Sequence, residues 1–147
     1  MEGLRSFIVH GHDETAKLAL KNYLQNTLKW PEPVILAEKP SGGKTIIEKF
    51  EEHSKNIDVV FVLLTPDDVG GAAGAHPASR ARQNVIFELG YFAGKFGRGS
   101  GRVILLHKGD LDLPSDLAGI VYIDISHGID AAGESIRKEV AALARIN

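Results

Sequence analysis

The 147-residue sequence contains no cysteine, which excludes disulfide frameworks, thiolate zinc sites and cysteine nucleophiles. It also lacks a basic excess: 17 Lys and Arg against 19 Asp and Glu give a net charge of -2, so polyanion binding is not the expected main activity. No apolar run is long enough to span a bilayer, and no signal-peptide pattern opens the chain. We therefore expect a cytoplasmic protein without direct contact to nucleic acid or membrane.

The composition that is present suits one compact domain. Hydrophobic residues make up 44% of the chain and charged residues 24%, which is ordinary for a soluble globular protein. The length favours a single hydrophobic core, and no linker or repeat divides the sequence. We expect one domain over residues 1–147, either a stand-alone protein or a domain excised from a longer one.

Apolar runs alternate with amphipathic stretches along the chain, which predicts an α/β fold with a five-stranded, mostly parallel sheet and helices on both faces. A loop rich in Gly and Ala is expected at 70–79. Ligands of such folds bind outside the carboxyl ends of the strands, here the loops that start at His10, Ala37, Thr65 and His107. The expected strands are 5–11, 34–36, 57–68, 102–109 and 119–124, and the expected helices are 14–28, the later part of 40–56, 82–96 and 128–146.

The stretch "PSGGKT" (40–45) invites comparison with a phosphate-binding loop. The full motif needs a glycine at the position that Glu38 occupies, and a glutamate there would direct negative charge at the phosphates. A flexible loop before a capped helix is the better interpretation, because Thr45 and Glu48 form a capping-box pattern.

Two other loops carry candidate polar groups. "VHGHDE" places His10, His12 and Asp13 after the first strand, but no further ligands cluster at metal-binding spacing. We favour a loop in which Gly11 lets the backbone approach a ligand and Asp13 caps the next helix, with a ligand role for either histidine left open. "TPDD" is reminiscent of a phosphoacceptor receiver domain, but the required acidic cluster after the first strand is missing.

The helix "RQNVIFELGYFAG" (82–94) sets Glu88 among apolar residues. Helical periodicity assigns one arc to the core and places Asn84 and Glu88 on the adjoining stripe, while Phe87 points away from the core. An apolar wall can tune a carboxylate, yet an ordinary half-exposed Glu88 paired with Lys95 or Arg82 explains the pattern equally well. The core arc contains Val85, Leu89, Phe92 and Phe96, flanked by Ile86 and Ala93.

The order of these motifs resembles bacterial TIR-like domains, in particular the nucleotide-binding family of antiphage TIR–STING and Pycsar TIR effectors. The matching stretches are "FIVHGHDETAK", "PSGGKTIIEKFEEHSKNIDVVFVLLTPDD", "ARQNVIFELGYFAGKFGR" and "LPSDLAGIVYI". The resemblance implies a flavodoxin-like TIR fold, with residues 37–45 as the mobile BB loop. It assigns Glu88 as the catalytic residue.

The resemblance further implies hydrolysis of the nicotinamide–ribose bond of NAD⁺, giving nicotinamide and ADP-ribose or a cyclic variant. NAD⁺ is then the substrate, and neither cofactor nor metal is expected. Activity would follow self-assembly through the 37–45 loop during antiphage defence, with a cyclic-nucleotide sensor such as STING as a possible partner. The pocket residues expected beside Glu88 are His10, Gly11, His12, Asp13, Lys44 and Asn84.

Two alternatives from other classes stay open. The domain can be a non-catalytic TIR module for assembly or nucleotide binding, for which exposed Phe87 would supply an interface. It can also be a nucleoside deoxyribosyltransferase-like enzyme, because those enzymes likewise combine an α/β sheet with a catalytic Glu.

Overall fold

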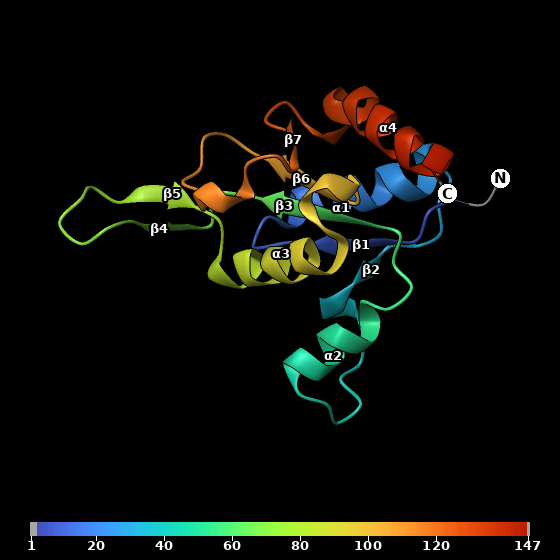
Figure 1. Ribbon diagram of the computed structural model, residues 1–147, viewed down its shortest axis with the longest axis horizontal. Helices are drawn as coiled ribbons and strands as arrows, with labels where there is room; N and C mark the ends of the chain where they lie inside the picture. Colours follow the sequence, from blue (N-terminus) through green and yellow to red (C-terminus); the bar gives the residue numbers. More distant parts are fainter. Residues whose placement is uncertain (1–2, 147) are drawn as a thin grey trace.

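The computed structural model describes residues 3–146, with side chains as far as residue 143. Its centre is a five-stranded sheet in the order β2-β1-β3-β6-β7, in which every neighbouring pair is parallel (Figure 1). This arrangement confirms the expected α/β flavodoxin-like fold. The order reverses between β1 and β3, which marks the position where such sheets usually bind ligands. The strands are β1 (Ser6–Val9), β2 (Val34–Ile35), β3 (Val59–Leu64), β6 (Val103–His107) and β7 (Val121–Asp124).

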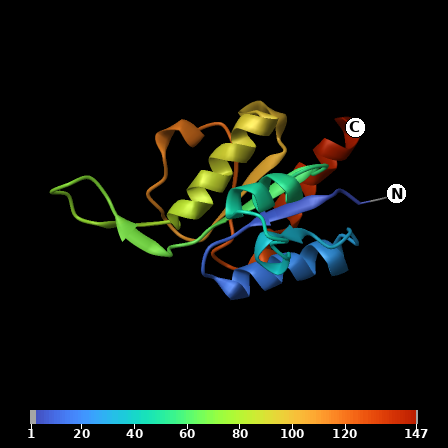
Figure 2. The ribbon, with the colours of Figure 1, turned by 90° about the horizontal axis from the view of Figure 1, so that it is seen from below.

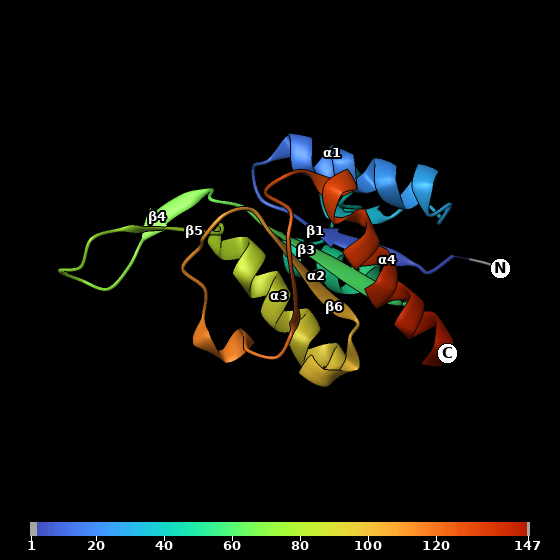
Figure 3. The same cartoon turned by 90° about the horizontal axis from the view of Figure 1, so that it is seen from above.

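Helices cover both faces of the sheet because alternate strand residues are apolar on both sides. On one face, α1 (Glu14–Asn22), which continues as a π-helical turn over Tyr23–Thr27, lies beside α4 (Ile129–Ile146) (Figure 3). On the other, α2 (Ile46–His53) and α3 (Gln83–Phe96) pack together (Figure 2). The sheet therefore separates two hydrophobic clusters, one for each helix pair.

The helix boundaries follow the local sequence signals. The Asp13 side chain accepts a hydrogen bond from the Ala16 backbone N–H at 3.0 Å and caps α1. At α2 the capping box is complete, since Thr45 and Glu48 each accept the other's backbone N–H at 3.1 Å. Both caps confirm the prediction from sequence. No helix within the described residues is long and apolar enough to cross a membrane.

The loop expected at 70–79 connects the two short strands of a hairpin, which include its end residues. Strands β4 (Asp68–Gly70) and β5 (Ala78–Arg80) pair antiparallel and project from the body of the domain (Figure 1). The loop is confirmed over 71–77, but the strand pairing at its two ends was not predicted, because this segment has few β-branched residues and no apolar alternation. Strand β3 correspondingly ends at Leu64, before Pro66.

Candidate active site

A cavity of about 270 Å³ lies at the carboxyl ends of β1 and β2, beneath α2 and α3. Three stretches that are distant in sequence meet there: the end of β1, the continuous stretch from the end of β2 through the 37–45 loop into α2, and the first turns of α3. Its position agrees with the rule that ligands of parallel α/β sheets bind beyond the strand ends. The lining residues are Ile8, His10, Leu36, Ala37, Ser41, Ile46, Lys49, Arg82, Asn84 and Glu88.

Glu88 is half-buried in this cavity on α3. Burial raises the pKa of its carboxyl group from the ordinary value of 4.5 to about 7, and the nearby charge of Arg82 opposes that shift. Among the described residues Glu88 forms no salt bridge. Lys95 donates instead to the Ser54 carbonyl at 2.9 Å. An ordinary surface ion pair with Lys95 or Arg82 is therefore wrong, and the carboxylate faces the cavity unpaired.

Two of the other predicted site residues reach the same cavity. Asn84 lies one helical turn before Glu88 on α3, and His10 follows β1. The Nδ1 atom of His10 lies 2.9 Å from the Gly11 carbonyl oxygen. Because a carbonyl can only accept, Nδ1 of His10 is the donor in this contact.

Gly11, His12 and Asp13 do not line the cavity but form the loop beside it. The His12 backbone N–H donates to Asp67 Oδ1 at 3.3 Å, and Asp13 accepts from Lys108 Nζ at 3.0 Å. The hydrogen bond from the Ala16 backbone, followed by the one from Lys108, lowers the pKa of Asp13. These contacts make the three residues supports of the loop that carries His10. No cluster of three or more metal-ligating side chains occurs within the described residues.

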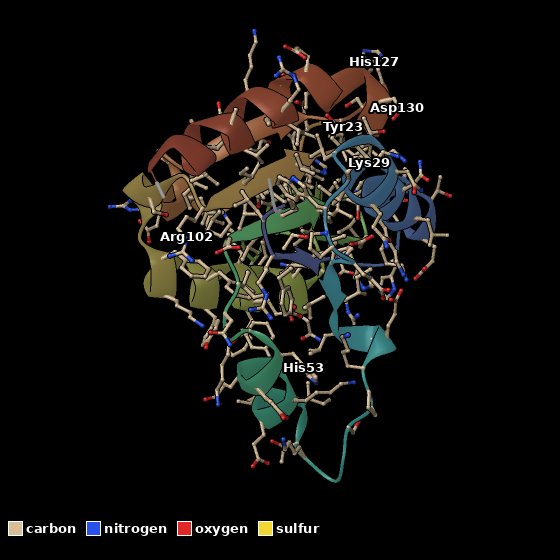
Figure 4. The ribbon with its side chains drawn as sticks, turned by 90° about the vertical axis from the view of Figure 1, so that its right-hand side faces the viewer. Tyr23, Lys29, His53, Arg102, His127 and Asp130 are labelled. Atoms are coloured by element: carbon tan, nitrogen blue, oxygen red, sulfur yellow. The ribbon has the colours of Figure 1, made fainter. Side chains whose placement is uncertain are left out.

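Lys44 does not come to the cavity, because its ammonium group contacts Glu52 further along α2. Helix α2, marked by His53, and the loop before it extend from the body of the domain (Figure 4). The cations that do line the cavity are Lys49 and Arg82, neither of which was predicted as a site residue. Lys49 could have been found from the sequence, because it lies three residues after Ile46 and both side chains therefore lie on one side of α2.

Comparison of the sequence with known proteins identifies the family of the domain. The model of the family "CAP12/Pycsar effector protein, TIR domain" matches residues 5–127. The chain belongs to this family. The match confirms the resemblance to bacterial TIR-like antiphage effectors and the TIR fold, and it includes β1, the 37–45 loop and all of α3.

Three relatives show how far the similarity extends. Uncharacterized protein YuaY of Escherichia coli K12 is 49% identical over 124 residues, which cover 83% of this chain and 40% of YuaY. Protein tirC of Dictyostelium discoideum is 36% identical over 139 residues, 87% of this chain and 67% of tirC. Pycsar effector protein BcPycTIR of Burkholderia cepacia is 33% identical over 112 residues, 69% of this chain and 36% of BcPycTIR. The chain therefore spans less than half the length of YuaY and of BcPycTIR.

Proposed function

We propose that this domain is an NAD⁺ glycohydrolase and that Glu88 is its catalytic carboxylate. The observation that carries the proposal is the lone carboxylate of Glu88 in the cavity, since none of the other described lining residues is acidic. It is half-buried, unpaired and located where a flavodoxin-like sheet binds ligands. Membership of the TIR effector family supports the same assignment.

The reaction needs little from the protein beyond electrostatics. The C1′–N bond of the nicotinamide ribose breaks, its electron pair passes to the pyridinium nitrogen, and neutral nicotinamide departs without a general acid. The sugar becomes oxocarbenium-like, and the ionised Glu88 carboxylate stabilises its positive charge. Water then forms the new C1′–O bond and loses a proton, for which Glu88 is the nearby base. Capture by an adenine nitrogen gives a cyclic product instead.

Binding of the substrate also favours the required ionisation state of Glu88. Without substrate, a pKa of about 7 leaves much of the Glu88 carboxyl protonated at neutral pH. A ribosyl pyridinium beside it carries positive charge, and an opposite charge within a few ångströms lowers a carboxyl pKa. The cationic substrate therefore generates the carboxylate that its own cleavage uses.

The size of the cavity supports a requirement for assembly. About 270 Å³ is below the range of roughly 300–1,000 Å³ that small-molecule sites usually have, so it suits the nicotinamide riboside end of NAD⁺. Ile46 and Ile47 at the start of α2 are 81% and 56% exposed and form an apolar rim. We propose that a second copy covers this rim through the 37–45 loop, as in a cytoplasmic defence effector switched on by a nucleotide sensor.

The test is NAD⁺ consumption with nicotinamide release at high protein concentration or under crowding. We expect turnover by the wild type and almost none by Glu88→Gln, with Glu51→Gln as a control that removes an exposed carboxylate from α2. Equal turnover by wild type and Glu88→Gln would overturn the assignment.

The same assay separates the alternatives. Phe87 is 61% exposed, which favours an assembly surface as the second candidate function. Self-association without NAD⁺ loss under any condition would support that non-catalytic module. Cleavage of deoxynucleosides in place of NAD⁺ would support a deoxyribosyltransferase-like enzyme.

A further inference from the structure

Two cations line the Glu88 cavity without a partner of their own. Lys49 comes from α2 and Arg82 from the residue just before α3, and both are half-buried. In the part of the chain that the structure describes, neither side chain forms a salt bridge or a hydrogen bond. Other lysines do have carboxylate partners, such as Lys21 with Glu38 at 3.0 Å.

The backbone adds positive character at the same place. Helix α3 has 14 residues, its first turn contains no acidic residue, and no side chain caps its N-terminus. The unsatisfied N–H groups and the helix dipole there favour an anion. Arg82 occupies the N-cap position and also lines the cavity, as does Asn84 in the first turn of α3, so the arginine and the helix N-terminus belong to the same side of the cavity. The cavity therefore offers one negative group, Glu88, and a cationic region beside it.

Such a pattern fits a ligand with a cationic end joined to an anionic group. We propose that Lys49 and Arg82 bind the diphosphate of a pyridine dinucleotide while Glu88 faces the ribosyl pyridinium. The guanidinium group can hold two phosphate oxygens at once, whereas the lysine ammonium supplies a point charge. This inference rests on the proposed NAD⁺ glycohydrolase function and extends it to substrate choice: phosphorylated pyridine nucleotides are cleaved, and nicotinamide riboside is a poor substrate although it has the same scissile bond.

The experiment compares nicotinamide riboside, nicotinamide mononucleotide and NAD⁺ as substrates of the full chain under assembly conditions. For wild type, kcat/KM should rise along this series. Lys49→Met should lower kcat/KM for NAD⁺ about ten-fold or more, as expected for a lost charge-assisted contact, and leave kcat/KM for the riboside within about two-fold. Arg82→Gln should lower the ratio of kcat/KM for NAD⁺ to kcat/KM for the riboside by about the same factor. Lys55→Met, which removes an exposed cation just after α2, is the matched control. It should change kcat/KM neither for NAD⁺ nor for the riboside.

The ratio of NAD⁺ to riboside cleavage isolates the diphosphate contact. Because the charge of Arg82 also acts on Glu88, Arg82→Gln can change the chemical step, but that change applies to both substrates. An equal loss for both substrates in both variants would overturn the proposal and indicate a role in folding or in tuning Glu88.

A binding measurement keeps the inference independent of turnover. If no condition gives cleavage, the proposed function fails, and titration calorimetry with ADP-ribose decides the subsite. Affinity about ten-fold weaker for Lys49→Met than for wild type and Lys55→Met supports the subsite. Equal affinity, or no binding to wild type, overturns it.

Discussion

The carboxylate of Asp67 occupies the space that a side chain at Gly11 would need. A Cβ atom at position 11 would lie 1.9 Å from Asp67 Oδ2. Asp67 cannot easily move away, because its Oδ1 accepts from the Thr65 hydroxyl at 2.9 Å and from the His12 backbone N–H. The loops after β1 and β3 are thus fitted to each other where the strand order reverses, and this fit positions His10 at the cavity.

Gly11→Ala should therefore destabilise the domain. The added methyl group has to displace a side chain held by two hydrogen bonds, and overpacking of this kind costs about 1–3 kcal/mol in the free energy of unfolding. Urea unfolding of the purified domain measures this cost. The Asp67→Ala background removes the three carboxylate atoms nearest to the added methyl group, so the cost of Gly11→Ala should largely disappear.

The control for Gly11→Ala is Gly94→Ala on α3. Apart from the adjacent residues and the backbone of α3 itself, no atom lies within 4 Å of a Cβ built at Gly94, and alanine favours a helix interior over glycine by about 0.5–1 kcal/mol. This variant should therefore unfold at higher urea concentration than the wild type. A Gly11→Ala variant as stable as Gly94→Ala would show that the Asp67 side chain moves aside without a measurable cost in the free energy of unfolding.

Glu88→Gln should stabilise the folded domain above neutral pH. The folded-state pKa of about 7 exceeds the ordinary 4.5, so the folded protein binds this proton more tightly than the unfolded chain does. The contribution of Glu88 to stability is full below 4.5 and is lost as the pH rises to about 7. At about pH 8 the neutral glutamine avoids the cost of burying a charge, on the order of 1–3 kcal/mol. Unfolding curves at about pH 4 and pH 8 should show the gain only at the higher pH.

Ionisation of Glu88 also predicts how the rate of NAD⁺ cleavage depends on pH. The ionised carboxylate is the active form, so kcat/KM for NAD⁺ should increase with pH and level off above about 7. Initial rates from about pH 5 to pH 9, each at saturating and limiting NAD⁺, measure this profile. A rate that is flat from pH 5 upward would show that Glu88 ionises normally in the working assembly.

Features that depend on local chemistry could be predicted from the sequence alone. Apolar runs predicted the parallel strands, and the N-caps at Asp13 and Thr45 were confirmed. Periodicity placed Val85, Leu89 and Phe92 in the core and Phe87 outside it, as the structure has them. Each of these features depends on a residue and neighbours within one or two helical turns, which one sequence contains in full.

The surroundings of Glu88 could not be read in the same way. Lys49 and Arg82 come beside it only because α2 and α3 pack on the same face of the sheet, with Phe50 against Tyr91 at 4.8 Å between ring centroids. That packing is tertiary and leaves no periodic signal. For the same reason Lys44 was expected at the site, whereas this residue lies in the loop before α2 and its ammonium group contacts Glu52 on that helix.

Two phenylalanines on α3 should differ sharply in what they contribute to stability. Phe92 is fully buried against Phe7 and Phe50, and Phe92→Ala should cost about 3–5 kcal/mol. Phe87 is 61% exposed, and Phe87→Ala should leave the unfolding midpoint almost unchanged. Sedimentation of the Phe87→Ala variant then tests whether this side chain serves self-association, and a large loss of stability would show instead that it is covered.

Substitutions at Asp13 separate its two roles, capping α1 and pairing with Lys108. Asp13→Ala removes both and should cost about 0.5–2 kcal/mol, the usual range for a lost N-cap. Asp13→Asn keeps an oxygen that can accept from the Ala16 N–H and loses only an exposed ion pair, so it should cost less than about 1 kcal/mol.

The pH dependence of stability separates the same two roles. Because the pKa of Asp13 is lowered in the folded domain, its charge stabilises the fold at pH values above the ordinary pKa of 3.8, and this contribution is lost as pH falls through the lowered pKa. Wild type and Asp13→Asn should therefore converge in unfolding free energy in acid, while Asp13→Ala remains weaker. An asparagine variant as unstable as the alanine variant at about pH 7 would make the Lys108 pair the dominant contact.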